Sequence, residues 1–162
     1  MFHRILVAID GEPTMAHQVL SESGAIAQCS GAALNIIQVM PPFNAVSTSS
    51  MPMMGTFSSV NTGAVTAYIE HWQKQEQAIH ARLQTLVAEF EGEGLTAEAT
   101  FAIGEPGREI CAVATAWDAD LIVLGRRGLG GLGQLLLGSV SSYVMHRAHC
   151  AVLIVQGETP GQ

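Results

Sequence analysis

A glycine-rich segment between an apolar run and a helical pattern constrains the fold of this chain more than any other feature. Residues 121–124 read Leu-Ile-Val-Leu, a run short enough to be a buried strand. The segment Gly125-Arg-Arg-Gly128 follows, and Gly138-Ser139 comes after nine further residues. Beyond it, residues repeat at helical spacing, namely Val140, Tyr143, Val144 and Arg147. This order predicts a strand, a glycine loop and a helix in succession.

A glycine loop in this position favours a bound phosphate. Backbone N–H groups can surround an anion there, and glycine allows both close approach and positive φ. Gly138-Ser139 add a small residue and a hydroxyl at the first helical turn, where the helix dipole favours negative charge. A Walker loop is excluded because the only lysine, Lys74, lies far from these glycines. The first predicted strand is followed by Asp-Gly-Glu-Pro, which excludes a Rossmann glycine motif.

The distribution of charge agrees with an anion site. The chain has a net charge of −7, yet residues 121–157 contain Arg126, Arg127, Arg147 and no acid. Arg126 and Arg127 are expected inside the glycine loop, where they would meet phosphate. The alternative is that a mostly buried segment simply contains few charges. The overall acidity argues against general nucleic-acid binding.

Apolar periodicity alternates between strand and helix along the whole chain. Strands are predicted at residues 3–9, 34–40, 95–103, 121–124 and 151–155, and helices at 13–30, 64–91, from 106 and up to 148. Residues 41–62, rich in Ser, Met, Pro and Gly, predict a long flexible loop. One face of the longest helix is expected to be buried through Ile69, Trp72, Ile79, Leu83, Leu86 and Phe90.

This alternation predicts an α/β fold: a single Rossmann-like domain with a five-stranded parallel sheet and helices on both faces. The domain is expected to cover residues 1–157, followed by a tail at 158–162. No apolar run approaches the roughly twenty residues of a spanning helix, and no leader is apparent, so a cytoplasmic protein without membrane insertion is expected. The cysteines Cys29, Cys111 and Cys150 lack CxxC spacing and are expected to be reduced, buried hydrophobes.

The spacing Gly-x2-Gly-x9-Gly-Ser resembles the nucleotide-binding signature of the universal stress protein family. The resemblance extends to Ile5-Leu-Val-Ala-Ile-Asp10-Gly11 and to Cys150-Ala-Val-Leu-Ile-Val155. Some members of that family bind ATP, and others lack the glycines and do not. This chain keeps them and is therefore similar to the ATP-binding type. The resemblance implies the strand order 3-2-1-4-5, which places the ligand between the first and fourth strands.

The resemblance also implies the residues of the site. ATP, or ADP or AMP, would bind with Mg2+. The adenine and ribose would be lined by Ala8, Ile9, Asp10 and Val39, and the backbone of Val39 would read the base edge. The phosphates would be surrounded by Leu124, Gly125, Arg127, Gly128, Gly138, Ser139 and Val140, with Ser141 as an additional hydroxyl. Asp10 would contact the nucleoside or a metal; its structural alternative is to cap the following helix.

Three functions remain open. The favoured one is an ATP-binding regulatory module of the stress response with little or no turnover, because no glutamate or histidine stands in the glycine loop. The others are a slow, partner-dependent ATPase and a nucleotide-free dimeric interaction protein. No catalytic residue and no downstream partner are assigned. His146, His149 and Cys150 have metal-like chemistry, but no fourth ligand is apparent.

The last predicted strand favours a homodimer. Residues 151–155 are wholly apolar and would lie at a sheet edge, which invites pairing with a second copy around a twofold axis. The alternative is that residues 41–62 or the tail from residue 157 cover this edge.

Overall fold

The computed structural model describes residues 1–42, 62–126 and 138–156, with the side chains of residues 62–65 and 68 excepted. The predicted alternation of strands and helices is confirmed. The elements are β1 (Arg4–Ile9), α1 (Pro13–Ser30), β2 (Ala33–Met40), α3 (Thr62–Gly92), β3 (Ala97–Ile103), α4 (Pro106–Ala116), β4 (Leu121–Arg126), α5 (Ser139–Arg147) and β5 (Ala151–Gln156).

The five strands form one parallel sheet in the order β3-β2-β1-β4-β5, as the resemblance implied. The first strand lies in the middle of the sheet, where β1 pairs with β2 on one side and with β4 on the other. The strand order reverses at this point. The carboxyl ends of β1 and β4 are therefore neighbours, and in open α/β sheets such a point is where ligands bind.

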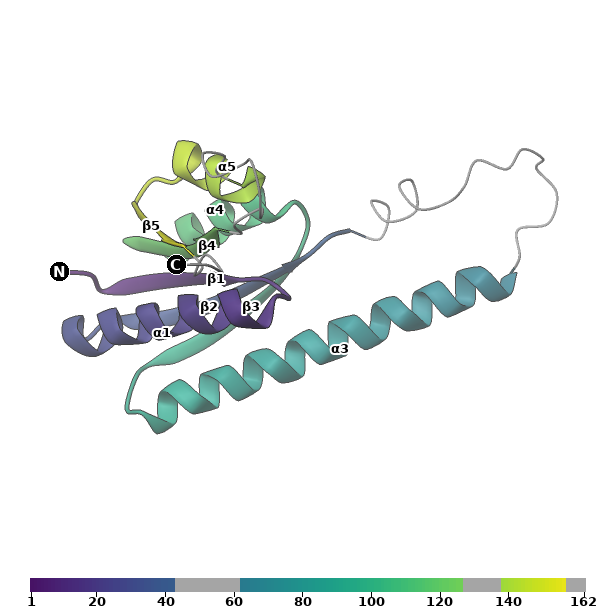
Figure 1. Cartoon of the computed structure of the whole chain (residues 1–162), viewed down its shortest axis with the longest axis horizontal. Coiled ribbons are helices and arrows are strands. Elements are labelled where there is room, and N and C mark those ends of the chain that lie inside the picture. Colours follow the sequence, from purple (N-terminus) through teal and green to yellow (C-terminus); the bar gives the residue numbers. More distant parts are fainter. Residues whose placement is uncertain (43–61, 127–137, 157–162) are drawn as a thin grey trace, which may run out of the picture.

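Helices cover both faces of the sheet (Figure 1), with α1 and α3 on one and α4 and α5 on the other. Because the central strands are buried on both sides, they read as continuous apolar runs rather than alternating ones. All five residues from Ile5 to Ile9 are buried, and they alternate between the two hydrophobic clusters. Truncating a fully buried residue such as Leu6 or Ile36 to alanine would cost about 2–5 kcal/mol.

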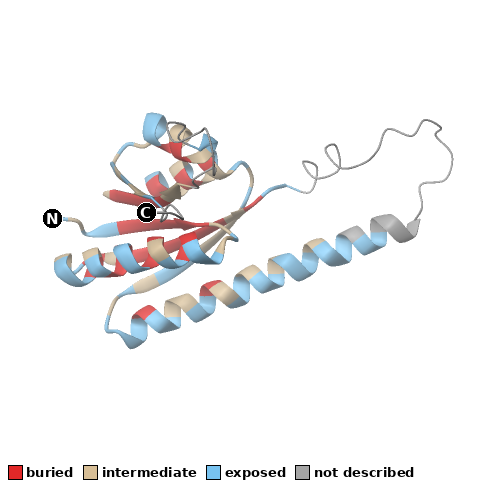
Figure 2. Ribbon diagram, in the orientation of Figure 1, coloured by how far each residue is buried: buried red, intermediate tan, exposed pale blue. Residues whose placement is uncertain are grey.

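Helix α3 differs from its prediction in how much of it is buried. Its 31 residues correspond to roughly 46 Å, far longer than a strand of eight residues. Its carboxyl-terminal part packs on the sheet, where Leu83 and Phe90 are buried, while the amino-terminal part extends past the sheet (Figure 2). Ile69 is 41% exposed, so its predicted burial is wrong. The periodicity identified the helix correctly, but sequence spacing does not reveal where the sheet beneath it ends.

The end of β4 differs from its prediction. Strand β4 continues through Gly125 and Arg126, which pair with β5, so these two residues belong to the strand rather than to the loop. The predicted flexible loop falls mostly on residues 43–61, and the tail on 157–162, and both lie outside the described residues. Within the described part of the chain, none of the helices is both long and apolar enough to span a membrane.

Candidate functional site

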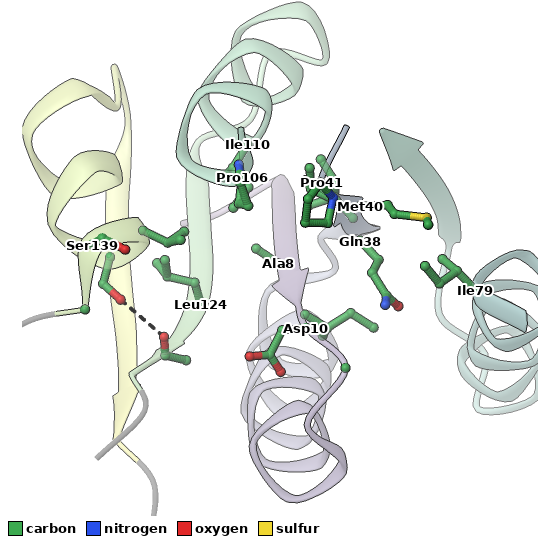
Figure 3. Close-up of a pocket in the computed structure, with 18 of the residues that line it drawn as sticks. Ala8, Asp10, Gln38, Met40, Pro41, Ile79, Pro106, Ile110, Leu124 and Ser139 are labelled. Atoms are coloured by element: carbon green, nitrogen blue, oxygen red, sulfur yellow. Dashed lines mark hydrogen bonds between the residues drawn. The ribbon is translucent and has the colours of Figure 1, made fainter. Parts of the chain in front are cut away.

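A pocket of about 670 Å³ opens at the carboxyl ends of β1 and β4 (Figure 3). It brings together every predicted site residue that the structure describes: Ala8, Ile9, Asp10, Val39, Leu124, Gly125, Gly138, Ser139, Val140 and Ser141. The other two, Arg127 and Gly128, lie outside the described residues. Segments more than 130 residues apart in the chain thus meet at one cavity, because parallel strands end at the same edge of the sheet.

Other residues of the pocket were not predicted. Helix α3 contributes a wall through Gln75, Ala78 and Ile79, α4 contributes Pro106 and Ile110, and the β2 end adds Ile37, Gln38, Met40 and Pro41. The positions of Pro41, directly after β2, and of Pro106, at the start of the helix that follows β3, were a usable signal, because both strands end at this edge. The α3 wall had no such signal, since it depends on how the long helix packs across the sheet.

Asp10 occupies the turn that leaves β1. Its Oδ1 accepts a hydrogen bond from the Glu12 N–H at 3.0 Å. The cap of α1 is Glu12, whose carboxylate accepts hydrogen bonds from the N–H groups of Thr14 and Met15. These bonds, that from Met15 first, lower the pKa of Glu12. The alternative role considered for Asp10, capping of the following helix, is therefore wrong. Glu12 caps α1, and Asp10 shapes the turn before it.

An arginine of α3, which covers the same face of the sheet as α1, supports the same turn. Arg82 of α3 donates a hydrogen bond from Nη1 to the main-chain oxygen of Asp10 at 3.0 Å. This bond ties α3, which forms one wall of the pocket, to the residue at its centre. The sequence did not predict this role, since Arg82 and Asp10 are 72 residues apart.

Gly125 is explained by packing. A Cβ atom at this position would collide with the Met15 side chain and come within 3.3 Å of Val19 Cγ2. Helix α1 can therefore lie this close to β4 only if residue 125 has no side chain. The predicted need for positive φ is wrong here, because the described positive-φ glycines are Gly31 and Gly94.

Gly138 has no packing explanation of this kind. Its φ of −57° and ψ of 154° suit any residue, and an added Cβ would be 3.9 Å from the nearest described atom, Ser141 Oγ. The predicted positive φ is therefore wrong for Gly138 as well. The remaining explanation for a glycine at this position is the open space beside it, because Gly138 caps α5 and lines the pocket. The first backbone N–H groups of a helix lack intrahelical partners and attract anions.

Ser139 and Ser141 have different environments. Ser139 is exposed at the first turn of α5, where its hydroxyl faces the pocket (Figure 3). Ser141 is buried, and its Oγ donates a hydrogen bond to the Gly125 carbonyl at 3.3 Å. A hydroxyl proton used in this way is not available to a phosphate, so Ser141 fixes α5 against β4.

The carbonyl of Val39 faces the space beyond the end of β1. The N–H of Ala33 bonds to His3 and that of Leu34 bonds to Thr96, so odd-numbered residues of β2 turn their backbone groups toward β1. The β1–β2 ladder ends at the pair Ile9 and Gln38. The Val39 carbonyl therefore lies one step past the ladder, where a hydrogen-bond donor could approach it.

The electrostatics of the described pocket are simple. Among the lining residues that the structure describes, Asp10 is the only acidic side chain, and none is a histidine or a cysteine. No group of three or more His, Cys, Asp or Glu residues suited to a metal is found among the described residues. His149, considered as a metal ligand, has Nδ1 3.2 Å from Thr115 Oγ1. Arg126 lies in β4 rather than in the loop, which corrects its predicted position.

The cysteines are free thiols, but only two resemble the prediction. Cys29 is exposed on α1, so its predicted burial is wrong. Cys111 and Cys150 are partly buried, and burial raises the pKa of each thiol; Asp120 adds to the increase at Cys150.

We expect Cys29 to be alkylated by iodoacetamide at neutral pH well before Cys111 and Cys150. Peptide mass spectrometry over time measures this order, and faster labelling of Cys111 or Cys150 would contradict it.

The sheet order and the pocket at its reversal place the chain in the Rossmann-like α/β class. Residues 1–156 match the model of the universal stress protein family. The chain is 38% identical over 156 residues to universal stress protein Sll1388 of Synechocystis sp., covering 96% of this chain and 98% of that protein. It is 32% identical to YxiE of Bacillus subtilis, covering 96% and 100%. The chain belongs to the universal stress protein family.

Solved structures share the fold. Hypothetical protein MJ0577 superposes with a TM-score of 0.76 at 21% identity, covering 98% of this chain and 99% of that one. A universal stress protein in complex with cAMP gives 0.65 at 23% identity, with 97% and 98% covered. One from Archaeoglobus fulgidus in complex with dAMP gives 0.58 at 21%, with 94% and 96% covered. The two complexes show that this fold holds adenine nucleotides in those proteins.

Proposed function

We propose that the protein is an adenine-nucleotide-binding regulatory module of the stress response, with ATP as its ligand. The observation that carries the proposal is the pocket itself, where the α5 amino terminus, the space beside Gly138 and the Asp10 turn share one cavity. An anion is favoured at the α5 end because the first turn contains no acid. Arg127 and Gly128 would complete the phosphate site, and the cAMP and dAMP complexes of family members support the class of ligand.

A magnesium ion would bind mainly through the phosphates. Mg2+ typically takes one or two carboxylates together with substrate phosphates. Among the described residues that line the pocket, Asp10 alone offers a carboxylate. The residues thus fit an ion that arrives with the nucleotide, which needs no dedicated cage of protein ligands.

We propose little or no turnover of ATP, because the described pocket lacks a free group that could activate water. Hydrolysis needs a group that orients or activates water next to the terminal phosphate. The one carboxylate among the described lining residues, Asp10, already accepts a hydrogen bond from the Glu12 N–H, and it lies apart from Ser139 at the α5 end (Figure 3). A slow, partner-dependent ATPase is the second candidate, favoured only if a partner supplies the missing group.

We also propose that two copies pair through β5. This strand is at the sheet edge, paired with β4 alone among the described strands, and Leu153 is 37% exposed on it. An apolar, uncharged edge strand is a template for another chain, and antiparallel pairing around a twofold axis closes the assembly. Residues 43–61 and 157–162, which could cover this edge instead, lie outside the described residues.

Calorimetry on nucleotide-stripped protein tests the ligand. We expect ATP with Mg2+ to bind with a Kd in the low micromolar range or tighter, about −8 kcal/mol. Absence of heat with ATP, ADP and AMP at two temperatures would contradict the proposal and favour a nucleotide-free interaction protein. Phosphate release measured on the same sample distinguishes the module, which should release almost none, from the slow ATPase.

A further inference from the structure

A second cavity, of about 750 Å³, lies between α1 and α3, which run side by side on one face of the sheet (Figure 1). It is lined by one side of α1, between Pro13 and Gln28, and by one side of α3, between Arg82 and Glu93. At 1.5 Å per residue these stretches are roughly 16–22 Å long. We call this cavity the α1–α3 groove. Its length corresponds to that of a helix of about 15 residues.

The floor of the α1–α3 groove is apolar. Leu20 and Phe90 are buried there, and Leu86 packs against the same hydrophobic cluster. Gly24 contacts Phe90 directly, because an added Cβ at residue 24 would lie 2.9 Å from Phe90 Cε1. The exposed α1 residue that follows in the lining is Ala25, which has a small side chain. A helix that approached from solvent would therefore meet apolar side chains with little obstruction from α1.

Hydrogen bonds tie both ends of the groove together. Near the start of α1, Arg82 Nη1 donates to the Asp10 main-chain oxygen at 3.0 Å. Near the end of α1, Gln28 Nε2 donates to Glu93 Oε2 at 3.5 Å. These two contacts also show that α1 and α3 run parallel, with their carboxyl ends together. The groove is therefore already formed in this structure, and a partner would not have to open it, which lowers the ordering cost of binding.

One end of the groove is acidic. Both helices end there, and their last carbonyl groups add negative partial charge. Neither last turn contains a basic residue, and the carboxylates of Glu89 and Glu93 line the same end. His17 and Arg82 line the opposite end. The groove is therefore complementary to a segment that carries basic side chains at one end of an apolar stripe.

We propose that the α1–α3 groove docks an amphipathic helix of a partner protein, with lysine or arginine side chains beside Glu89 and Glu93. Helix-in-groove recognition uses apolar residues at i, i+3, i+4 and i+7, which suit an elongated apolar floor between two helices. The acidic end selects basic partners over acidic ones. The inference goes beyond the proposed nucleotide and does not depend on it, because the described linings of the groove and of the nucleotide pocket share no residue.

A capped, fluorescein-labelled peptide of about 15 residues tests the proposal on the unmodified chain. The peptide has leucine at the stripe positions, lysine beside them at one end and alanine elsewhere. We expect fluorescence anisotropy to show saturable binding of this lysine peptide. A matched peptide with glutamate in place of lysine should bind at least about tenfold more weakly. No binding of the lysine peptide, or equal binding of the two peptides, would overturn the proposal.

Paired charge variants test where the lysine peptide binds. Glu89→Gln/Glu93→Gln removes two carboxylates that line the groove, and the affinity should fall about tenfold. Glu70→Gln/Glu91→Gln removes the same charge from exposed positions of α3 outside the groove. This control should change the affinity less than about twofold, because solvent and salt screen more distant charges. Equal losses in the two double variants would indicate general attraction to an acidic protein and would overturn the docking site.

Filling the groove tests the apolar contact. Ala25 is exposed and lines the groove, so Ala25→Trp would occupy space above the floor and lower the affinity for the lysine peptide more than about tenfold. Ala81→Trp, exposed on α3 outside the groove, should keep the affinity. Both variants should unfold within about 3 °C of the unmodified protein. An unchanged affinity in Ala25→Trp would overturn the proposal. A mass that falls in Ala25→Trp without peptide would also overturn it, by assigning the groove to a second copy.

Discussion

Replacing Gly138 by valine is expected to abolish nucleotide binding while the protein stays folded. The backbone at Gly138 suits any residue, and its Cβ would meet no described atom closer than 3.9 Å. The branched side chain would therefore occupy the space proposed for phosphate rather than clash with protein. We expect the affinity for ATP to fall more than about 100-fold, or about 3 kcal/mol. Gly138→Ala should give an intermediate loss, and calorimetry with thermal unfolding measures both properties.

Gly125→Val is the matched control with the opposite expectation. Its side chain would displace Met15 and Val19, and overpacking of this kind costs about 1–3 kcal/mol. The thermal midpoint should fall by about 5 °C in a protein of this size. If Gly138→Val lost as much stability as Gly125→Val, its effect on binding would be explained by unfolding, and the phosphate assignment of Gly138 would be wrong.

Replacing Leu153 by aspartate should separate the proposed dimer into monomers. Leu153 is exposed in one copy and would be buried between two edge strands, where an unpaired carboxylate costs about 3–5 kcal/mol. The dimer Kd should therefore rise more than about 100-fold. Analytical ultracentrifugation at tens of micromolar measures the mass, and a monomeric unmodified protein would contradict the proposal at once.

The other edge of the sheet offers the control for this experiment. Ile103 is 44% exposed on β3, which is the opposite edge strand. Ile103→Asp should leave the dimer intact if β5 is the interface. Dissociation by Ile103→Asp, with Leu153→Asp still dimeric, would assign the interface to β3 instead.

Most of the fold could be predicted because local signals and periodicity agree. Pro13 and Gly31 bound α1 as expected, and the left-handed φ of 71° at Gly31 accounts for the glycine there. The apolar run at residues 121–124 was correctly interpreted as a strand next to β1, with the order taken from the family resemblance. These features depend on neighbouring residues or on a pattern shared by relatives.

The errors arise where long-range packing decides. The burial of Ile69 depends on where the sheet ends beneath α3, and the role of Gly125 depends on Met15 from another element. In the same way, the sequence predicted only a strand at Gln38, because the burial of its side chain depends on elements that are distant in the chain. In a strand that is buried on both sides, the sequence does not show which helices will cover each face.

The central position of β1 has a consequence for the newly made chain. The pocket joins Ala8 and Asp10, near the amino terminus, to Ser139, near the carboxyl terminus. During synthesis β1 can pair with β2 early, but its other neighbour, β4, and the helix α5 emerge more than 100 residues later. Binding of the proposed ligand would therefore have to wait for a nearly complete polypeptide, because a translation product that ends before α5 lacks that wall of the pocket.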